Sequence, residues 1–285
     1  MNKNANILIV GLGLLGGSYA KALTKKGYKV HAIDKNEDSI EYAKNEKIIV
    51  SGTTKEDKDL IKTADLVVFA LYPHVFLEWV QRNKNNFKDG AILTDVTGVK
   101  ESVVYKIQDL LPDNVEFISA HPMAGRELSG VRNADPKIFK NANYIVVPTN
   151  KNTKNAIKTC EKLGKELGFE KISTLSPKDH DEMIAFLSQL THCIAVALMC
   201  SNDSENLSKY TGDSFRDLTR IAKINDEMWS ELFLLNKTQL LSQMDAFKET
   251  FDKLYDTIKN DDRTQMREMM KLSTTRRATF DKKEN

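Results

Sequence analysis

A glycine-rich run near the start of the chain has the spacing of a phosphate-binding loop. Gly11, Gly13 and Gly16 form the pattern G-x-G-x-x-G, directly after the apolar segment Ile7–Val10. A stretch with helical periodicity follows, so the run lies where a strand turns into a helix. Backbone N–H groups at such a helix start bind a pyrophosphate. We therefore expect a dinucleotide to contact this loop, whose residues are Gly11, Leu12, Gly13, Leu14, Leu15 and Gly16.

An acidic residue, Asp34, ends the next β-like segment, 18 residues after Gly16. A carboxylate at this position accepts hydrogen bonds from a ribose 2′-hydroxyl and repels a 2′-phosphate. The sequence therefore favours NAD as the cofactor, while Lys35, next to Asp34, keeps NADP as the alternative. The structural alternative is that these residues form only a tight strand–helix turn with a surface aspartate.

His121 is the strongest candidate for catalysis. It follows a predicted strand over 115–119, and Pro122 restricts its backbone to an extended conformation. Doubly wound sheets bind ligands at the carboxyl edge of their strands. An imidazole there can take the proton of an alcohol while a hydride leaves the same carbon. By spacing alone, a catalytic and a structural role fit His121 equally.

The other histidines in the first two thirds of the chain are weaker candidates. His31 lies in a predicted strand, which favours a structural role, and His74 follows a strand end without further support. His180 begins a predicted helix. No H-E-x-x-H or similar spacing occurs in the chain, so we predict no metal site.

Two further pairs lie later in the chain. Ser188 and His192 are four residues apart and share one helix face, away from the apolar stripe. Arg216 and Arg220 are also four apart, and a guanidinium can hold a carboxylate through two hydrogen bonds. The structural alternatives are a helix histidine whose hydrogen bonds are satisfied within the protein and a surface run of ion pairs.

The elements that position these residues change character along the chain. β-Rich segments alternate with helix-like segments in the first part, which predicts an α/β fold with a doubly wound, mostly parallel sheet of the Rossmann type. The predicted strands are 6–10, 28–33, 66–70, 91–94, 115–119, 144–147 and 171–174. The predicted helices between them include 14–26, 74–83, 99–111 and 154–167.

Glycine and proline mark the boundary between two predicted domains. All 6 prolines and 12 of the 13 glycines lie in residues 1–177. Because these residues break regular elements, 178–285 should contain few, long helices. We predict a dinucleotide-binding domain over 1–177 and an all-α substrate and dimerisation domain over 178–285.

Apolar residues recur at helical spacing in two stretches of the second domain, from Met183 to Leu198 and from Trp229 to Ile258. An unbroken helix over the second stretch would be roughly 45 Å long. A stripe of that length usually packs on another subunit, so we expect a homodimer; packing across the first domain is the alternative.

Composition excludes other classes of protein. The 285 residues are 41% hydrophobic and 29% charged, with a net charge of +2, so neither disorder nor nucleic-acid binding is expected. Three cysteines without a C-x-x-C pair indicate a reducing compartment. The uncharged stretch from Asn4 to Ala20 contains four glycines and is not followed by a long apolar span. We therefore expect a cytoplasmic protein without a membrane segment or signal peptide.

Five runs, in order along the whole chain, resemble the prephenate and arogenate dehydrogenases. The H-P-M-A-G-x-E-x-S-G block is specific, whereas the dinucleotide loop is not. The runs are Gly11–Ser18, Thr94–Val96, His121–Gly130, Phe215–Ala222 and Met228–Trp229. The resemblance implies a Rossmann domain joined to a helical dimerisation domain. It also implies NAD(P)-dependent oxidative decarboxylation of a cyclohexadienol, prephenate or arogenate, in tyrosine biosynthesis.

The same resemblance implies roles for particular residues. His121 corresponds to the catalytic histidine that bonds the C4 hydroxyl of the substrate, and Arg220 to the arginine that binds a substrate carboxylate. His192, with Ser188 near it, corresponds to a substrate-site histidine. Further positions of the substrate site correspond to Glu127 and Trp229.

The chain also departs from the family pattern. Thr97-Gly98 stands where many relatives have a glycine and a serine that contacts the hydroxyl, so either Thr97 or a backbone N–H is expected to replace that contact. Gln189 and Thr191 replace a histidine and a proline common in relatives. Neither a fused chorismate mutase nor an ACT domain is expected.

Two other functions remain open at the level of sequence. A β-hydroxyacid dehydrogenase would have the same two-domain plan but usually places a catalytic lysine in its helical domain. A dinucleotide sensor without chemistry would need neither His121 nor an inward-facing arginine.

Overall fold

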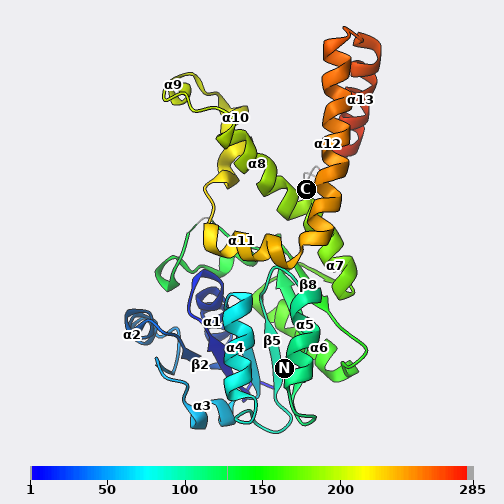
Figure 1. Ribbon diagram of the computed structural model, residues 1–285. Coiled ribbons are helices and arrows are strands. Elements are labelled where there is room, and N and C mark those ends of the chain that lie inside the picture. The colour runs from blue at the N-terminus through cyan, green and yellow to red at the C-terminus, as the bar shows by residue number, and fades with distance from the viewer. Residues whose placement is uncertain (1, 127, 281–285) are drawn as a thin grey trace. The chain divides into compact units, whose positions relative to one another are not determined.

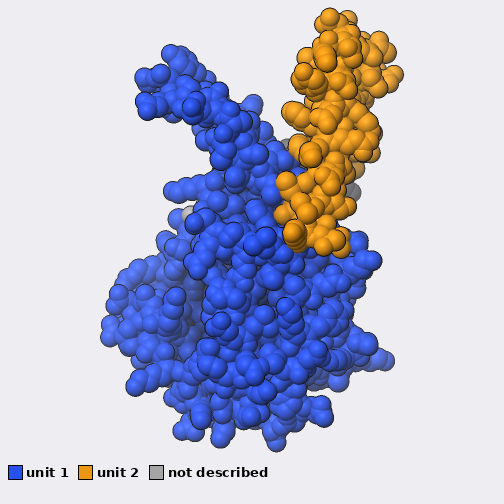
Figure 2. Space-filling model, in the orientation of Figure 1, with its two compact units in different colours: residues 1–236 blue, residues 237–285 orange. Residues whose placement is uncertain are grey.

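The computed structural model describes residues 2–126 and 128–280. The chain divides into two compact units, residues 1–236 and residues 237–285 (Figure 2). The first unit contains both β-sheets, and the second contains two helices. The predicted domain boundary after residue 177 rests on composition and stays a prediction.

The first unit is built on a six-stranded sheet in which all paired neighbours are parallel (Figure 1). Its strand order is β3-β2-β1-β4-β5-β6. The order reverses direction between β1 and β4, and ligands of doubly wound sheets bind in the crevice at that point. The Rossmann-type prediction is confirmed. The strands are β1 (Asn6–Val10), β2 (Lys29–Ile33), β3 (Ser51–Thr53), β4 (Leu66–Phe69), β5 (Ile92–Asp95) and β6 (Glu116–Phe117).

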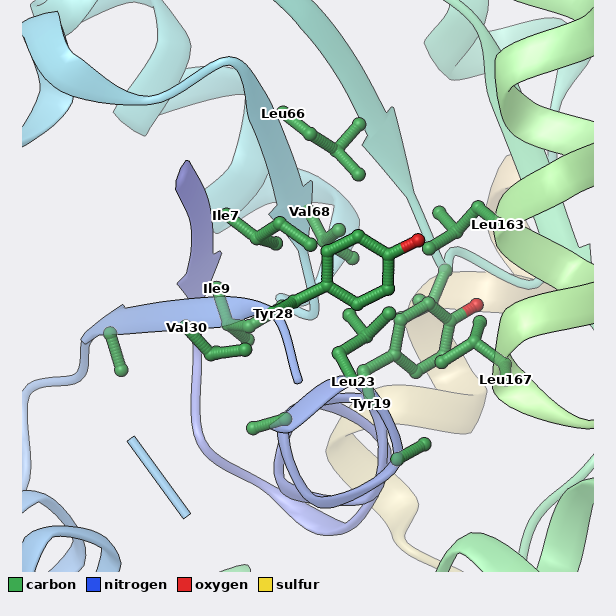
Figure 3. Packing of buried hydrophobic residues seen from close by; sticks show 14 of the residues in the cluster. Ile7, Ile9, Tyr19, Leu23, Tyr28, Val30, Leu66, Val68, Leu163 and Leu167 are labelled. Atoms are coloured by element: carbon green, nitrogen blue, oxygen red, sulfur yellow. The ribbon is translucent and has the colours of Figure 1, made fainter. Parts of the chain in front are cut away.

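Both faces of this sheet are buried, as the near-continuous apolar runs of its strands require. Ile7 and Ile9 of β1 pack into one core cluster, and Leu8 and Val10 pack into another. Figure 3 shows the first cluster, where strand residues meet α1 and α6. The covering helices are α1 (Leu14–Lys25) and α6 (Lys154–Leu167) on that face, and α4 (Pro73–Asn83) and α5 (Glu101–Leu110) on the other.

Three short elements were absent from the sequence-based description. Helices α2 (Glu37–Asn45) and α3 (Lys58–Thr63) and strand β3 (Ser51–Thr53) lie between β2 and β4. All three residues of β3 are partly exposed, so this strand lacks the alternation of buried and exposed residues by which strands are recognised.

The predicted strand over 115–119 is wrong as a single element. The chain forms β6 and then a separate strand, β7 (Ser119–Pro122), which pairs antiparallel with β8 (Asn143–Val147). β9 (Lys171–Thr174) adds to β8 in parallel and completes a three-stranded sheet. His121 therefore lies inside a strand of this second sheet, opposite Ile145, and not in a loop after the main sheet.

Helices form the rest of the first unit. The predicted helix over Met183–Leu198 exists, but a π-helical segment, Ala185–Leu190, separates α7 from α8. π-Helical segments are rare in proteins, and those that occur often lie at functional sites. The helices are α7 (Pro177–Ile184), α8 (Thr191–Cys200), α9 (Leu207–Tyr210), α10 (Asp213–Thr219) and α11 (Asp226–Leu235), with short 3-10 helices η1 (Val131–Asn133), η2 (Pro136–Phe139) and η4 (Arg220–Ala222).

A single helix from Trp229 to Ile258 is also wrong. α11 ends at Leu235 and α12 (Lys237–Lys259) begins after Asn236, whose backbone leaves the helical region. The buried Asn236 side chain donates hydrogen bonds to the Asp181 carbonyl and the Gln189 side chain. These bonds hold Asn236 inside the first unit. The second unit is α12, roughly 35 Å long, packed on α13 (Arg263–Ala278).

One helical run, Pro177–Cys200, is long and apolar enough to cross a membrane by length and composition. Only 28% of its most apolar window is buried. The expectation of no membrane segment rests on the stretch from Asn4 to Ala20 and does not cover this run. A helix of a soluble protein can meet the same criterion.

Candidate active site

The glycine loop has the geometry that pyrophosphate binding requires. Gly11 has a φ of +96°, and a Cβ there would lie 2.5 Å from the Ala70 carbonyl oxygen. A Cβ on Gly16 would lie 1.8 Å from the Gly11 carbonyl oxygen, so only glycine lets α1 pack on β1 this closely. No heavy atom lies within 4 Å of a Cβ on Gly13, where the loop faces open space.

The start of α1 has no side-chain cap. Its N–H groups and the positive end of its dipole are therefore available to an anion.

Asp34 lies beside this loop, directly after β2. Its carboxylate accepts the N–H of Leu12 at 2.5 Å and the N–H of Asn36 at 2.8 Å. These bonds tie the end of β2 to the glycine loop and fix the carboxylate in place. An ionised carboxylate has further lone pairs for ribose hydroxyls. The loop and Asp34 together fit a dinucleotide.

His121 belongs to a chain of hydrogen-bonded side chains. Its Nδ1 lies 2.8 Å from Nε2 of His180, and Nδ1 of His180 lies 2.7 Å from Oδ1 of Asp181. His180 and Asp181 are buried at the start of α7, whereas His121 is half-buried. One edge of the His121 ring is therefore occupied by His180.

Burial sets the protonation of these groups. It lowers the pKa of His180 to about 3, with the Lys100 charge contributing, and it raises the pKa of Asp181 to about 6. Burial, His180 and Lys100 together hold the pKa of His121 well below its ordinary value. Both imidazoles are therefore neutral at neutral pH, while Asp181 is mostly ionised.

A buried ion pair supports the strand that carries His121. Lys100 Nζ lies 2.9 Å from Oδ2 of Asp95, and both side chains have no solvent exposure. Lys100 also donates to the Ala120 carbonyl at 2.7 Å, while Asp95 accepts from the Ser119 hydroxyl and the Ala120 N–H. Burial would raise the pKa of Asp95, but Lys100 and the hydrogen bonds hold it below its ordinary value.

Sequence reasoning missed four residues of this arrangement: Asp95, Lys100, His180 and Asp181. Asp95 stood in a recognised run, Thr94–Val96, without a role. The adjacency of a histidine and an aspartate at 180–181 was a usable signal, but it was read only as a helix start. Nothing in the sequence marks Lys100 as buried.

Thr97 is a buried neighbour of the same ion pair. Its hydroxyl contacts the Asp95 carboxylate and the Val99 carbonyl, and Lys100 Nζ donates to it at 3.2 Å. The hydroxyl is thus directed toward Asp95 and Lys100. A direct contact of Thr97 with substrate stays a prediction.

The helical part brings two predicted residues together. The rings of His192 and Trp229 are stacked, with centroids 3.7 Å apart and an interplanar angle of 30°. Nδ1 of His192 lies 2.8 Å from the backbone carbonyl oxygen of Ser188, so this serine holds the imidazole through its backbone.

A buried amide pair joins the elements that carry these rings. Gln189 donates to the Leu232 carbonyl of α11 at 3.0 Å and accepts from Asn236 at 2.8 Å. The π-helical segment and α11 are thereby bonded to each other. Gln189, which departs from the family pattern in the sequence, therefore has a structural role: it joins the π-helical segment to α11.

Arg220 and Glu127 are the remaining predicted residues of the substrate site. Arg220 begins η4 and is exposed. Arg216, one turn earlier, pairs with Asp213 at 2.7 Å. Glu127 lies outside the described residues. The roles of Arg220 and Glu127 stay predictions.

An open cavity of about 480 Å³ lies between residues of α8, α9, α10 and η4. Its walls are formed by Met199, Leu207, Ser208, Thr211, Phe215, Arg216, Thr219, Ala222 and Lys223.

The other histidines have local partners. His31 Nδ1 lies 2.8 Å from the Ser51 hydroxyl, in agreement with a structural role, and His74 pairs with Glu231 of α11 at 2.9 Å. Within residues 2–126 and 128–280, no three His, Cys, Asp or Glu side chains converge as metal ligands would. The absence of a metal from the reaction stays a prediction.

The fold and the site define a class of protein. A parallel sheet with the order 3-2-1-4-5-6, a glycine loop with an acidic residue beside it, and a neutral histidine held from one side are the features of a dinucleotide-dependent oxidoreductase.

Comparison with protein families identifies the group within this class. Residues 19–172 match the nucleotide-binding domain of prephenate dehydrogenase, and residues 176–272 match the dimerization domain of the same enzyme. The chain belongs to the prephenate dehydrogenase family of oxidoreductases.

Individual relatives agree with this assignment. A crystal structure of prephenate dehydrogenase from A. aeolicus, in complex with hydroxyphenyl propionate and NAD+, is 30% identical with a TM-score of 0.90, and the match covers 99% of each chain. Prephenate dehydrogenase from Bacillus subtilis is 29% identical over 90% of this chain and 71% of its own length. Cyclohexadienyl dehydrogenase from Zymomonas mobilis is 28% identical over 94% of this chain and 93% of its own length.

Proposed function

We propose that the chain catalyses the NAD-dependent oxidative decarboxylation of prephenate to 4-hydroxyphenylpyruvate, a step of tyrosine biosynthesis. The observation that carries this proposal is the neutral, half-buried His121, held through Nδ1 by His180. Its second nitrogen, Nε2, remains for a substrate hydroxyl.

The cofactor assignment rests on the loop and on Asp34. The open space at Gly13 and the uncapped start of α1 suit a pyrophosphate, and the Asp34 carboxylate suits a ribose 2′-hydroxyl. The A. aeolicus relative was crystallised with NAD+. When bound, NAD accepts the hydride that leaves C4 of the substrate.

His121 handles the proton that accompanies this transfer. As the C4–H bond breaks, Nε2 of His121 takes the proton of the C4 hydroxyl, and the C4–O bond becomes a carbonyl. The bond between C1 and its carboxylate then breaks, CO₂ leaves, and the electron pair makes the ring aromatic. The C4 oxygen becomes a phenolate and takes back the proton from His121, so the reaction releases no net proton.

The two carboxylates of prephenate need cationic or hydrogen-bonding partners. By its place in the Phe215–Ala222 run, Arg220 binds one of these carboxylates. His192, stacked on Trp229, is a second substrate-binding residue. Ser188 supports His192 through its carbonyl. Thr97 and Glu127 are proposed as further substrate-site residues.

Arogenate is the alternative substrate, because the Zymomonas mobilis relative carries the broader name cyclohexadienyl dehydrogenase. A rate matrix with prephenate and arogenate, each with NAD and with NADP, distinguishes the possibilities. We expect prephenate with NAD to give the highest kcat/KM, with CO₂ and 4-hydroxyphenylpyruvate as products. No reduction of either dinucleotide with either substrate would contradict the proposal.

A homodimer is proposed as the active assembly. Residues 176–272 match a dimerization domain, and Phe251, Tyr255 and Ile258 of α12 are each 58% exposed. Apolar patches of this kind are uncommon on monomers, and obligate interfaces commonly bury about 2,000 Å² or more. Light scattering at micromolar concentration should give twice the mass of one chain; a monomer would contradict the proposal.

The cysteines bear on the cellular location. Cys160, Cys193 and Cys200 are free thiols. We propose a cytoplasmic location, where thiols remain reduced. Fractionation of cells that express the full chain should recover the activity in the cytosol, and recovery in the membrane fraction would contradict it.

A further inference from the structure

His180 and Asp181 are buried ionisable residues that the proposed reaction does not consume. Burial of such groups is costly unless their polar atoms are bonded. We propose that His180 and Asp181 are positioning residues that fix the tautomer of His121, leaving its Nε2 without a proton. The inference rests on the proposed role of His121 as the base.

The Asp181 carboxylate is surrounded by donors. Its Oδ1 accepts the backbone N–H of Lys100 at 2.8 Å, and its Oδ2 accepts the backbone N–H of Glu101 at 2.8 Å. These two N–H groups lie at the start of α5, where the helix dipole also favours a negative charge. Asp181 is thereby held in an orientation that turns Oδ1 toward His180.

An ionised carboxylate can only accept hydrogen bonds. At 2.7 Å from Oδ1, Nδ1 of His180 must therefore carry the proton and donate it. A neutral imidazole has one protonated nitrogen, so Nε2 of His180 carries a lone pair.

The same reasoning applies to the next ring. Nε2 of His180 accepts, so Nδ1 of His121, 2.8 Å away, must donate. Because His121 is also neutral, its Nε2 has no proton and can take one from a substrate hydroxyl. An unrestrained imidazole prefers the opposite tautomer, with the proton on Nε2, which could not act as a base.

The charged groups around the chain of bonds are consistent with this arrangement. The Lys100 ammonium and the Asp95 carboxylate form their own pair on the β5–α5 side, and Asp181 is the carboxylate on α7. Burial and the Lys100 charge disfavour a second proton on His180. His180 thus stays a neutral ring that donates to Asp181 and accepts from His121.

Two substitutions of His180 separate positioning from packing. In His180→Gln, the side-chain amide can donate to Asp181 while its carbonyl oxygen accepts from His121, so the polarity of the chain is kept. In His180→Leu, which has a similar volume, nothing accepts from His121. We expect His180→Leu to lower kcat on the order of 10²-fold with little change in the KM of prephenate or NAD. We expect His180→Gln to retain kcat within about fivefold.

A purely structural role predicts a different result. Loss of packing would move KM, NAD affinity and thermal stability together, and would not distinguish the two variants by polarity. Equal kcat values for folded His180→Gln and His180→Leu, or a kcat of His180→Leu within threefold of wild type, would overturn the proposal.

A spectroscopic test does not depend on turnover. The ¹⁵N shifts of His121, assigned by comparison with His121→Asn, should show a protonated Nδ1 and an unprotonated Nε2 in the wild-type protein. In His180→Leu the proton should move to Nε2. A wild-type spectrum with the proton on Nε2 would overturn the proposal even in an active enzyme. If prephenate is not oxidised at all, the proposed function fails, while the spectrum still decides the tautomer.

Discussion

Replacement of Lys100 by methionine tests the buried ion pair beneath the active site. Methionine keeps the length and most of the volume of lysine but removes the ammonium. Asp95 then loses its 2.9 Å partner, and the Ala120 carbonyl loses its 2.7 Å donor, both without access to water. The bond from Lys100 to Ala120 also holds β7, the strand that carries His121.

The size of the expected loss in unfolding free energy follows from the burial of the ion pair. Removing one partner of a buried pair leaves an uncompensated charge and typically costs about 3–5 kcal/mol of the free energy of unfolding. Lys151→Met is the matched control, because Lys151 pairs with Asp109 at 2.5 Å and both side chains are more than half exposed. An exposed pair contributes less than about 1 kcal/mol despite its shorter distance.

The difference in unfolding free energy between wild type and Lys100→Met should depend on pH. In the wild type, Lys100 holds the pKa of Asp95 below its ordinary value, so the stabilisation is present at neutral pH and is lost only as the pH falls through that lowered value. In Lys100→Met, burial instead raises the pKa of Asp95. The folded variant then binds a proton at a higher pH than the unfolded chain does, so its deficit in unfolding free energy should be smaller at about pH 5 than at about pH 7.

Urea unfolding of wild type, Lys100→Met and Lys151→Met at both pH values measures these differences. A deficit of Lys100→Met that equals that of Lys151→Met would refute the reasoning. A deficit that grows at lower pH would refute the assignment of the cost to an unpaired Asp95.

Other substitutions test the proposed roles directly. His121→Asn should keep NAD affinity but lower kcat on the order of 10²–10⁴-fold, because the base is lost; a near wild-type kcat would remove His121 from the mechanism. Arg220→Gln should raise the KM of prephenate roughly 10- to 100-fold with little change in kcat, since a charge-assisted bond to a carboxylate is removed. Arg216→Gln is its control, and equal KM values for the two variants would place the carboxylate elsewhere. Asp34→Ala should weaken NAD binding and reduce the preference of the enzyme for NAD over NADP. A wild-type enzyme that prefers NADP would contradict the role of Asp34. Because burial raises the pKa of Asp181 to about 6, kcat/KM should fall as the pH drops through about 6; a flat profile down to about 5 would contradict an essential ionised Asp181.

Local features of this protein could be predicted from its sequence. The glycine loop, the helix after it and Asp34 occupy positions set by spacing along one strand–helix–strand unit, and the structure has them in that arrangement. The strands at 6–10 and 143–147 and the helix at 154–167 were also predicted to within a residue, because buried runs and amphipathic periodicity are local properties.

The supporting residues of the site could not be predicted in this way. His121 meets a ring 59 residues later in the chain, and Lys100 meets an aspartate 81 residues later through its backbone N–H. Spacing along the chain carries no information on such contacts. The burial of Lys100 depends on Asp95, and the pKa of Asp181 depends on its burial against α5, so neither property belongs to the residue itself.

The tertiary structure also overrode two local patterns. The apolar stripe from Trp229 to Ile258 has unbroken helical periodicity, yet the buried bonds of Asn236 separate α11 from α12. The β-rich segment at 115–119 divides because Asp95 binds Ser119 and Ala120 and β8 pairs with the strand that follows. Sequence periodicity determined which segments are apolar on one side. Hydrogen bonds between distant segments decided where those segments end, because a buried polar group must find a partner wherever the fold places one.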